Sequence, residues 1–241
     1  MKKHLLLLSI IMSISVLCGC ANKRKDAITS VVTSYNNSIF ANDTTTAEQY
    51  LNRQALSNFK SNVSNYKSTA KILSQEVKIL ASNEEFAIVS VDIDSAIIPQ
   101  GKNIEVLSRD TILYYLEKEN DWKIIKTGIT NNYFNKKLNK KPKEIDKNTV
   151  ESIVKSYIEN IASGKVLEAS IHLTGNLYND AIKYNIKNLP IGTVKDIELD
   201  IIASTEEAMV IRAKYKFSDQ ERNLLMIVLK INNEWKIQDV I

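Results

Sequence analysis

Apolar positions recur along the chain with two different periods. Near the beginning they follow the three- and four-residue spacing of one helix face, at Ile28, Val31, Val32, Tyr35 and Ile39. From Ala87 to Ile93 they stand at every second position, which is the period of a strand with one buried and one solvent-facing side. Further strands are predicted over residues 111–117 and 122–127. The pattern therefore predicts helices followed by an antiparallel sheet.

The same succession of patterns occurs a second time. A shift of 122 residues places residues 31–51 on residues 153–173, and residues 79–85 on residues 201–207. The second helix face falls at Val150, Ile153, Val154, Tyr157 and Ile161. A constant shift over so long a stretch indicates a tandem duplication. The predicted fold class is α+β, in two tandem copies of a helix pair packed on a curved antiparallel sheet.

Two details of each copy follow from local signals. The second helix of the pair is expected to start around Thr45, where a Thr-x-x-Glu capping pattern occurs, and around Lys165 in the second copy. Both copies end in a tryptophan strand, where the shift has fallen to 113. The second copy is therefore expected to be shorter at one hairpin tip, where residues 94–109 correspond to the shorter SDQERN.

The first twenty residues carry a targeting signal. Two lysines precede an apolar run over residues 5–17, which is shorter than the roughly 20 residues of a membrane-spanning helix and matches the core of a signal peptide. The run ends in LCGC, which resembles the lipobox of bacterial lipoproteins. The resemblance implies cleavage after Gly19, lipidation of Cys20 with diacylglycerol and palmitate, and an anchor on the extracytoplasmic face of the cell membrane. Cys18 departs from the small or weakly polar residues usual at its position.

These signals divide the chain into five segments. They are a signal peptide over 1–19, an acylated N-terminus and tether over 20–27, a first repeat over 28–129, a linker over 130–147 and a second repeat over 148–241. The linker carries six lysines around a single proline, so it is expected to be solvated rather than folded. Its alternative interpretation is an electrostatic contact with anionic headgroups or wall polymer.

The order of elements in each copy resembles the nuclear-transport-factor-2-like, or cystatin-like, superfamily. In that superfamily the final strand often carries a Trp-Lys-Ile type sequence after a tight turn, and WKI begins here at Trp122 and at Trp235. The resemblance covers residues 28–129 and 146–241 and implies that the helix pair lies in the concavity of a bent sheet. It also implies a cell-envelope setting, since tandem copies behind a membrane anchor recur in envelope proteins that include components of conjugation machinery.

Composition leaves few kinds of chemistry open. No cysteine follows Cys20, which excludes zinc–thiolate sites, disulfides and thiol catalysis from the mature chain. The 32 Lys and Arg against 28 Asp and Glu show no bias of the kind that nucleic-acid binding requires. No phosphate-binding loop, dinucleotide fingerprint or hydrolase motif occurs. We therefore expect no cofactor, no metal, no nucleic-acid partner and no catalytic residue.

Five residues mark the places where a pocket or a core is expected, namely Tyr35, Trp122, Tyr157, His172 and Trp235. The tryptophans are expected to fill the cores rather than to line ligand pockets. His172 is the one histidine after the lipobox, and Tyr50 stands at its place in the first copy, which favours packing over general-base catalysis.

Paired acids are the remaining candidate for chemistry. Asp92 and Asp94 share one strand face and would serve as an acid and a base only at a raised pKa. The second copy has Lys214 and Lys216 at the same positions, and this charge reversal favours a solvent-facing surface.

One function is preferred on these grounds, with two alternatives. The preferred function is a membrane-anchored, non-catalytic lipoprotein that binds another envelope protein or serves as a scaffold. The first alternative is a small-molecule-binding or hydrolytic pocket in one of the two domains, because the superfamily includes enzymes. The second is an oligomeric component of conjugation or sporulation machinery, which would form a homo-oligomer.

Overall fold

The computed structural model describes residues 22–62, 69–98, 103–129, 142–184 and 191–241. The chain divides into two compact units, Met1–Thr130 and Asn131–Ile241, which are described here one at a time. The signal peptide, Cys20 and linker residues 130–141 lie outside the described residues.

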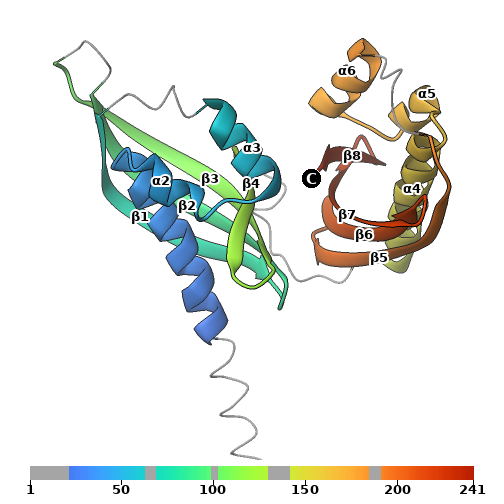
Figure 1. Cartoon of the computed structure of the whole chain (residues 1–241), viewed down its shortest axis with the longest axis horizontal. Helices are drawn as coiled ribbons and strands as arrows, with labels where there is room; N and C mark the ends of the chain where they lie inside the picture. Colours follow the sequence, from blue (N-terminus) through green and yellow to red (C-terminus); the bar gives the residue numbers. More distant parts are fainter. Residues whose placement is uncertain (1–21, 63–68, 99–102, 130–141, 185–190) are drawn as a thin grey trace, which may run out of the picture. The chain divides into compact units, whose positions relative to one another are not determined.

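Unit 1 places its helices before its strands. The N-terminal helix covers residues 22–40 and is followed by α2 (Thr44–Glu48) and α3 (Arg53–Asn62). The strands are β1 (Thr69–Ser82), β2 (Phe86–Ile98), β3 (Val106–Lys118) and β4 (Trp122–Ile129), and they form an antiparallel meander in the order β1-β2-β3-β4. Figure 1 shows the helices lying on one side of a curved sheet.

Unit 2 repeats this order element by element. Its helices are α4 (Glu144–Ala162), α5 (Val166–Ser170) and α6 (Gly175–Tyr184). Its strands are β5 (Val194–Ser204), β6 (Ala208–Phe217), β7 (Gln220–Ile231) and β8 (Glu234–Val240), again in sequential antiparallel order (Figure 1). The predicted α+β class and the tandem duplication are therefore confirmed.

In each core, side chains at helical spacing pack against side chains at every second strand position. In unit 1, Ile28 and Val32 of the N-terminal helix are fully buried against alternate residues of β2, from Ala87 to Ile93. In unit 2, Val150 and Val154 of α4 pack in the same way against Met209, Ile211 and Ala213 of β6. Burial of such faces is the main favourable contribution to folding, at roughly 25 cal/mol per Å² of apolar surface.

The helical part of each unit differs from the predicted pair, because it contains a third segment. The short α2 is capped by Asp43, whose Oδ1 accepts from the backbone nitrogen of Thr46 at 3.0 Å, so it begins just before the predicted Thr45. The chain then leaves the helical path at Leu51, which forms an isolated parallel bridge with Ile124 of β4. This bridge separates α2 from α3, and Leu173 with Ile237 repeats it in unit 2.

The sequence did not predict strands β1 and β5. The way in which each pairs with the next strand explains why. The pairing of β1 with β2 shifts between Ile72 and Ser74 and again between Ile79 and Ala81. The pairing of β5 with β6 shifts twice as well. Each such bulge moves later side chains to the opposite face, which breaks the period of two that identifies a strand.

The prediction of one solvent-facing sheet side is wrong for part of each sheet. Ile88 of β2 and Tyr115 of β3 face away from the helical core, yet both are buried. In unit 2, Val210 and Ile227 occupy the same kind of position and are buried as well. The sequence signal is the run FAIV from Phe86, in which four apolar residues follow one another, because a strand that is buried on both faces does not alternate.

The hairpin between β2 and β3 is where the two copies differ most in length. In unit 2, β6 and β7 are joined by the two-residue turn Ser218-Asp219, whose φ angles of 47° and 66° are those of a tight hairpin turn. In unit 1 the equivalent strands continue to the pair Ile97 and Val106 before the connection. The predicted shortening of the second copy therefore lies at this tip.

The interiors also differ at one equivalent pair of positions. In unit 1 the buried Tyr114 hydroxyl donates to Asn36 Oδ1 at 2.6 Å, and Asn36 Nδ2 lies 3.3 Å from Gln75 Oε1. In unit 2 the equivalent residues are the apolar Ile158 and Met226. A polar bond thus occupies the middle of one core and an apolar contact the middle of the other.

Tyr114→Phe is expected to lower the unfolding free energy of unit 1 by about 1–3 kcal/mol, because it leaves the buried Asn36 amide oxygen without this donor. Urea unfolding followed by Trp122 fluorescence in a Trp235→Phe background measures the change. Tyr178→Phe is the control, since Tyr178 is 41% exposed. Equal unfolding free energies for Tyr114→Phe and the control would contradict the assignment.

Candidate functional site

Unit 2 contains a cavity between α4, the end of β6 and the start of β7. Its volume is about 190 Å³. The residues that line it are Tyr157, Ile158, Ile161, Ala162, Tyr215, Phe217, Arg222 and Leu224. Ligand pockets for drug-sized molecules span roughly 300–1,000 Å³, so this cavity suits a single ring or a branched aliphatic group.

The polar groups of the cavity are two tyrosines and one arginine. Burial raises the pKa of Tyr157 to about 12 and also raises the pKa of Tyr215. Both hydroxyls are therefore neutral near pH 7 and can donate or accept hydrogen bonds. Arg222 is exposed at the mouth, where its Nη2 donates to Gln220 Oε1 at 2.9 Å. This arrangement can hold a small apolar body and an anionic group, but it supplies no base.

Unit 1 has different side chains at the equivalent place. Tyr35, which corresponds to Tyr157, is buried and lies edge-on to Tyr114 with ring centroids 6.0 Å apart. The two predicted tyrosine landmarks therefore have different surroundings, one in a core and one on a cavity wall. At the place of Ala162, which lines the cavity, unit 1 has Phe40, whose side chain packs against the core.

Both tryptophans are buried in the cores, with 4% of Trp122 and 5% of Trp235 exposed. The indole nitrogen of Trp235 donates to Asp146 Oδ1 at 2.9 Å, and Lys230 Nζ lies 3.0 Å from the same oxygen. These two bonds lower the pKa of Asp146 below its ordinary value. The contacts tie the start of α4 to the last hairpin. Neither tryptophan lines the cavity described above, but Trp122 also borders an open groove in unit 1, beside Val31 of the N-terminal helix.

His172 lies in the turn after α5, outside the cavity. Its Nε2 is 2.9 Å from Ser156 Oγ of α4, and Ser156 Oγ accepts from Asn160 Nδ2 at 3.3 Å. Partial burial, with the charge of Lys236, lowers the pKa of His172 below 6.5. A serine and a neutral imidazole are thus adjacent, but in the described part of the chain no carboxylate bonds the imidazole to orient it as catalytic triads require.

The paired acids lie on the sheet face opposite the helical core and are held in ion pairs. Arg109 Nε is 2.6 Å from Asp94 Oδ1, and this bond, followed by one from Ser74, lowers the pKa of Asp94 to about 2. Bonds from Thr111 and Lys78 lower the pKa of Asp92 in the same way. Both carboxyls are ionised near neutral pH, so the raised pKa that acid–base catalysis would need is absent here.

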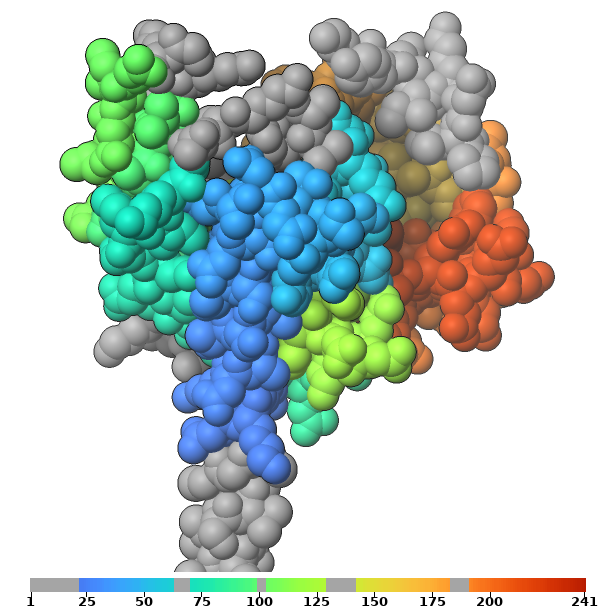
Figure 2. Space-filling model, turned by 60° about the vertical axis from the view of Figure 1, so that its left-hand side comes forward, coloured from blue at the N-terminus to red at the C-terminus, as the bar shows by residue number. Residues whose placement is uncertain are grey.

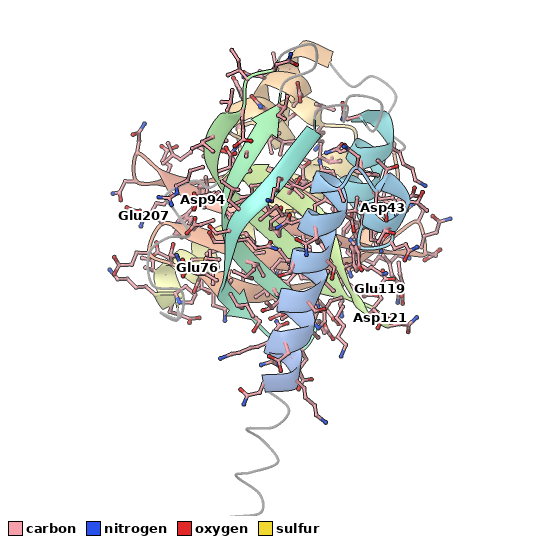
Figure 3. The ribbon with its side chains drawn as sticks, turned by 90° about the vertical axis from the view of Figure 1, so that its left-hand side faces the viewer. Asp43, Glu76, Asp94, Glu119, Asp121 and Glu207 are labelled. Carbon is pink, nitrogen blue, oxygen red and sulfur yellow. The ribbon has the colours of Figure 1, made fainter. Side chains whose placement is uncertain are left out.

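One further acidic side chain, Glu76 of β1, lies beside Asp92, since the two residues pair across the strands and both contact Lys78 Nζ. Figure 3 shows Glu76 and Asp94 on the sheet, with Glu119 and Asp121 apart from them in the turn between β3 and β4. Within the described ranges, no group of three or more His, Cys, Asp or Glu side chains could hold a metal ion. In the same ranges, no helix has the length and apolarity to cross a membrane.

Sequence reasoning missed an exposed apolar surface at the tip of unit 1. The hairpin end, as we name it, consists of Leu73, Ile98, Ile104, Val106 and Leu107. Their exposed fractions are 53%, 38%, 68%, 48% and 71%. The sequence did carry a signal for this surface, namely the extra length of the hairpin in the first copy. The fold does not require that extra length, because the second copy lacks it.

Comparison with known proteins identifies no family. No protein-family profile matches the chain, and no curated protein sequence matches it. Among solved structures, the intermembrane space region of the chloroplast protein ARC6 aligns with a TM-score of 0.37 and 14% identity, over 43% of this chain and 95% of that one.

Two further structures align over more of the chain. An NTF2-like protein involved in plasmid conjugation has a TM-score of 0.32 and 8% identity, over 82% of this chain and 85% of that one. A cystatin-like protein from Ruminococcus gnavus has a TM-score of 0.28 and 10% identity, over 76% and 68%. At these scores the likenesses add no argument about activity or partners.

The pKa of His172, measured by proton NMR on the mature chain, is expected to lie below its ordinary value of 6.5. The imidazolium is disfavoured by partial burial and by the positive charge of Lys236. Lys236→Gln should therefore raise the pKa towards 6.5, whereas Lys165→Gln should leave it unchanged. A pKa above 6.5, or one that does not respond to Lys236→Gln, would contradict these causes.

Proposed function

We propose that this protein is a lipid-anchored, extracytoplasmic module of the cell envelope that binds a protein partner and has no catalytic activity. The hairpin end is the observation that carries the proposal. Five apolar side chains are exposed there at the tip of one sheet, with Ile98 and Leu107 on the face opposite the helical core, although large apolar residues are usually withdrawn from water. Such a surface is typical of a site that another protein covers.

The duplication supplies an internal control for this argument. Unit 2 closes the same hairpin with Ser218 and Asp219, and its sheet is otherwise equivalent. The fold is therefore complete without the longer hairpin of unit 1. Since exposed apolar surface favours aggregation and the fold does not need it, its presence supports a role in binding.

The position of the hairpin end suits a partner outside the anchoring membrane. The N-terminal helix is already formed at residue 22, two residues after Cys20. Figure 1 shows the hairpin between β2 and β3 ending on the side of unit 1 opposite to the start of this helix, and Figure 2 shows residues 103–110 standing out at the surface. If Cys20 carries the lipid, the hairpin end points away from the membrane.

A variant at the centre of the hairpin end tests the proposal. With a photo-crosslinking amino acid at position 104, intact cells are expected to give a crosslinked adduct of the membrane-bound chain, and Leu107→Asp should reduce that adduct about tenfold or more. Leu167→Asp is the matched control, because Leu167 is 66% exposed on unit 2. Cys20→Ser should release the chain from the membrane fraction. An adduct that survives Leu107→Asp, or a Cys20→Ser chain still in the membrane, would contradict the proposal.

The cavity of unit 2 supports a second candidate function, the binding of a small amphipathic carboxylate. Its apolar walls would take the body of the ligand, and Arg222 at the mouth would pair with the carboxylate.

Benzoate and 3-phenylpropionate are suitable probes for this second function. They should raise the melting temperature of unit 2, whereas Ala162→Leu, which fills the cavity, should abolish the shift. Ala41→Leu, at an exposed alanine of unit 1, is the control that should keep it. If neither probe raises the melting temperature of the unmodified chain, this second function is excluded for this ligand class.

A further inference from the structure

We propose that the hairpin end is a two-fold contact surface on which a second copy of this chain docks. The inference rests on the proposed function, because it names the partner of the surface described there. It follows from the way in which charged and apolar side chains are arranged around the tip of the sheet.

The strand register places the residues of this surface. Lys71 of β1 pairs with Ala96 of β2, and Ala96 pairs with Leu107 of β3, so these three form one row across the sheet. Ile98 lies two residues beyond Ala96 on the same face, and Glu105 precedes β3 two residues before Leu107. The face is the one opposite the helical core, because Val91 and Ile93 point to the core from alternate positions of β2.

The charges at the rim of this surface have opposite signs and lie on opposite sides of its centre. Lys71 and Glu105 are both exposed, and in the described part of the chain neither forms an ion pair. Arg109, two residues from Leu107 on β3, is already engaged with Asp94 through contacts of 2.6 and 2.9 Å. One available cation and one available anion therefore flank an apolar centre formed by Ile98 and Leu107.

Such a surface is complementary to itself. A two-fold contact uses the same patch on both partners. If one residue of the first copy contacts a second residue of the other copy, the same contact therefore occurs again in the opposite direction. An axis that passes midway between Lys71 and Glu105 brings the ammonium of each copy onto the carboxylate of the other. Ile98 and Leu107 of both copies then meet close to the axis and are removed from water.

Unit 2 does not offer the same surface. Its sheet ends at the pair Phe217 and Gln220, and the strands stop before the level of Lys71, Ala96 and Leu107. The two-fold contact is therefore assigned to unit 1 alone.

The small size of the surface suggests where the contact forms. Stable interfaces bury roughly 1,200 Å² or more and use many residues of each partner, whereas this surface offers few apolar side chains, so association in dilute solution is expected to be weak. Two chains anchored in one membrane are held at a much higher effective concentration, which favours the contact without any additional interaction.

Cysteine crosslinking in membranes tests the inference. The mature chain has no cysteine other than Cys20, whose sulfur the lipid occupies if the anchor is as proposed, so Leu107→Cys introduces one reactive thiol. A bismaleimide that spans the roughly 10 Å between packed sheets should convert the full chain to a covalent dimer. Leu167→Cys, which places an equally exposed thiol on unit 2, should give no dimer.

Charge reversal identifies the pairing. In the Leu107→Cys background, Lys71→Glu or Glu105→Lys alone should reduce the dimer about fivefold to tenfold, because each turns two attractive contacts into repulsive ones. The double variant Lys71→Glu with Glu105→Lys should restore the dimer, since the reversed charges pair again across the axis. Failure of the double variant to restore it would overturn the two-fold contact.

The masses of the adducts separate this inference from the proposed function. A dimer mass supports both. An adduct between the Leu107→Cys chain and a different protein, without dimer, would overturn the two-fold contact and leave the protein-binding function standing. Absence of any adduct at position 107, with the introduced thiol shown to be reactive towards a monofunctional maleimide, would overturn both.

Discussion

Burial of one helix face against alternate residues of a curved sheet is the constraint on which the rest of this structure depends. It acts twice, through Ile28 and Val32 in unit 1 and through Val150 and Val154 in unit 2. The buried side chains must recur at helical spacing on one element and at every second position on the other. For this reason the two copies stay recognisably alike in these elements, and their differences lie where this packing leaves the choice of residue open.

Three of these differences bear on where function lies. The middle of the core holds a polar bond in unit 1 and apolar side chains with an adjacent cavity in unit 2. The start of the first helix has Asp146 bound to Trp235 in unit 2, while the equivalent position in unit 1 is Arg24. The hairpin between the second and third strands is long and apolar in one copy and short and polar in the other. We expect function to lie at these places, because the fold forms in one copy or the other without each of these features.

The fold class and the duplication could be predicted from the sequence because both are expressed in unbroken periods. The strands β1 and β5 could not, since their bulges interrupt the alternation that identifies a strand. Burial of the outer face around Ile88 was missed because alternation was expected where the sequence shows a continuous apolar run. The candidate sites could not be predicted from the spacing of apolar residues along the sequence, because they depend on how the strands pair. The cavity beside Tyr157 is lined by residues of α4, β6 and β7, and the register of β6 with β7 that brings these residues together is not visible in the sequence. Lipidation of Cys20 stays a prediction from the lipobox.

The central claim is that this chain acts through an outer apolar surface rather than through an interior site. Hydrogen–deuterium exchange compares the chain in its native membranes with the purified, lipid-free mature chain and tests that claim directly. The account predicts slower exchange in the membranes over residues 103–110, with residues 157–162 and 215–224 unchanged. Slower exchange over residues 157–162 and 215–224, with residues 103–110 unchanged, would contradict it.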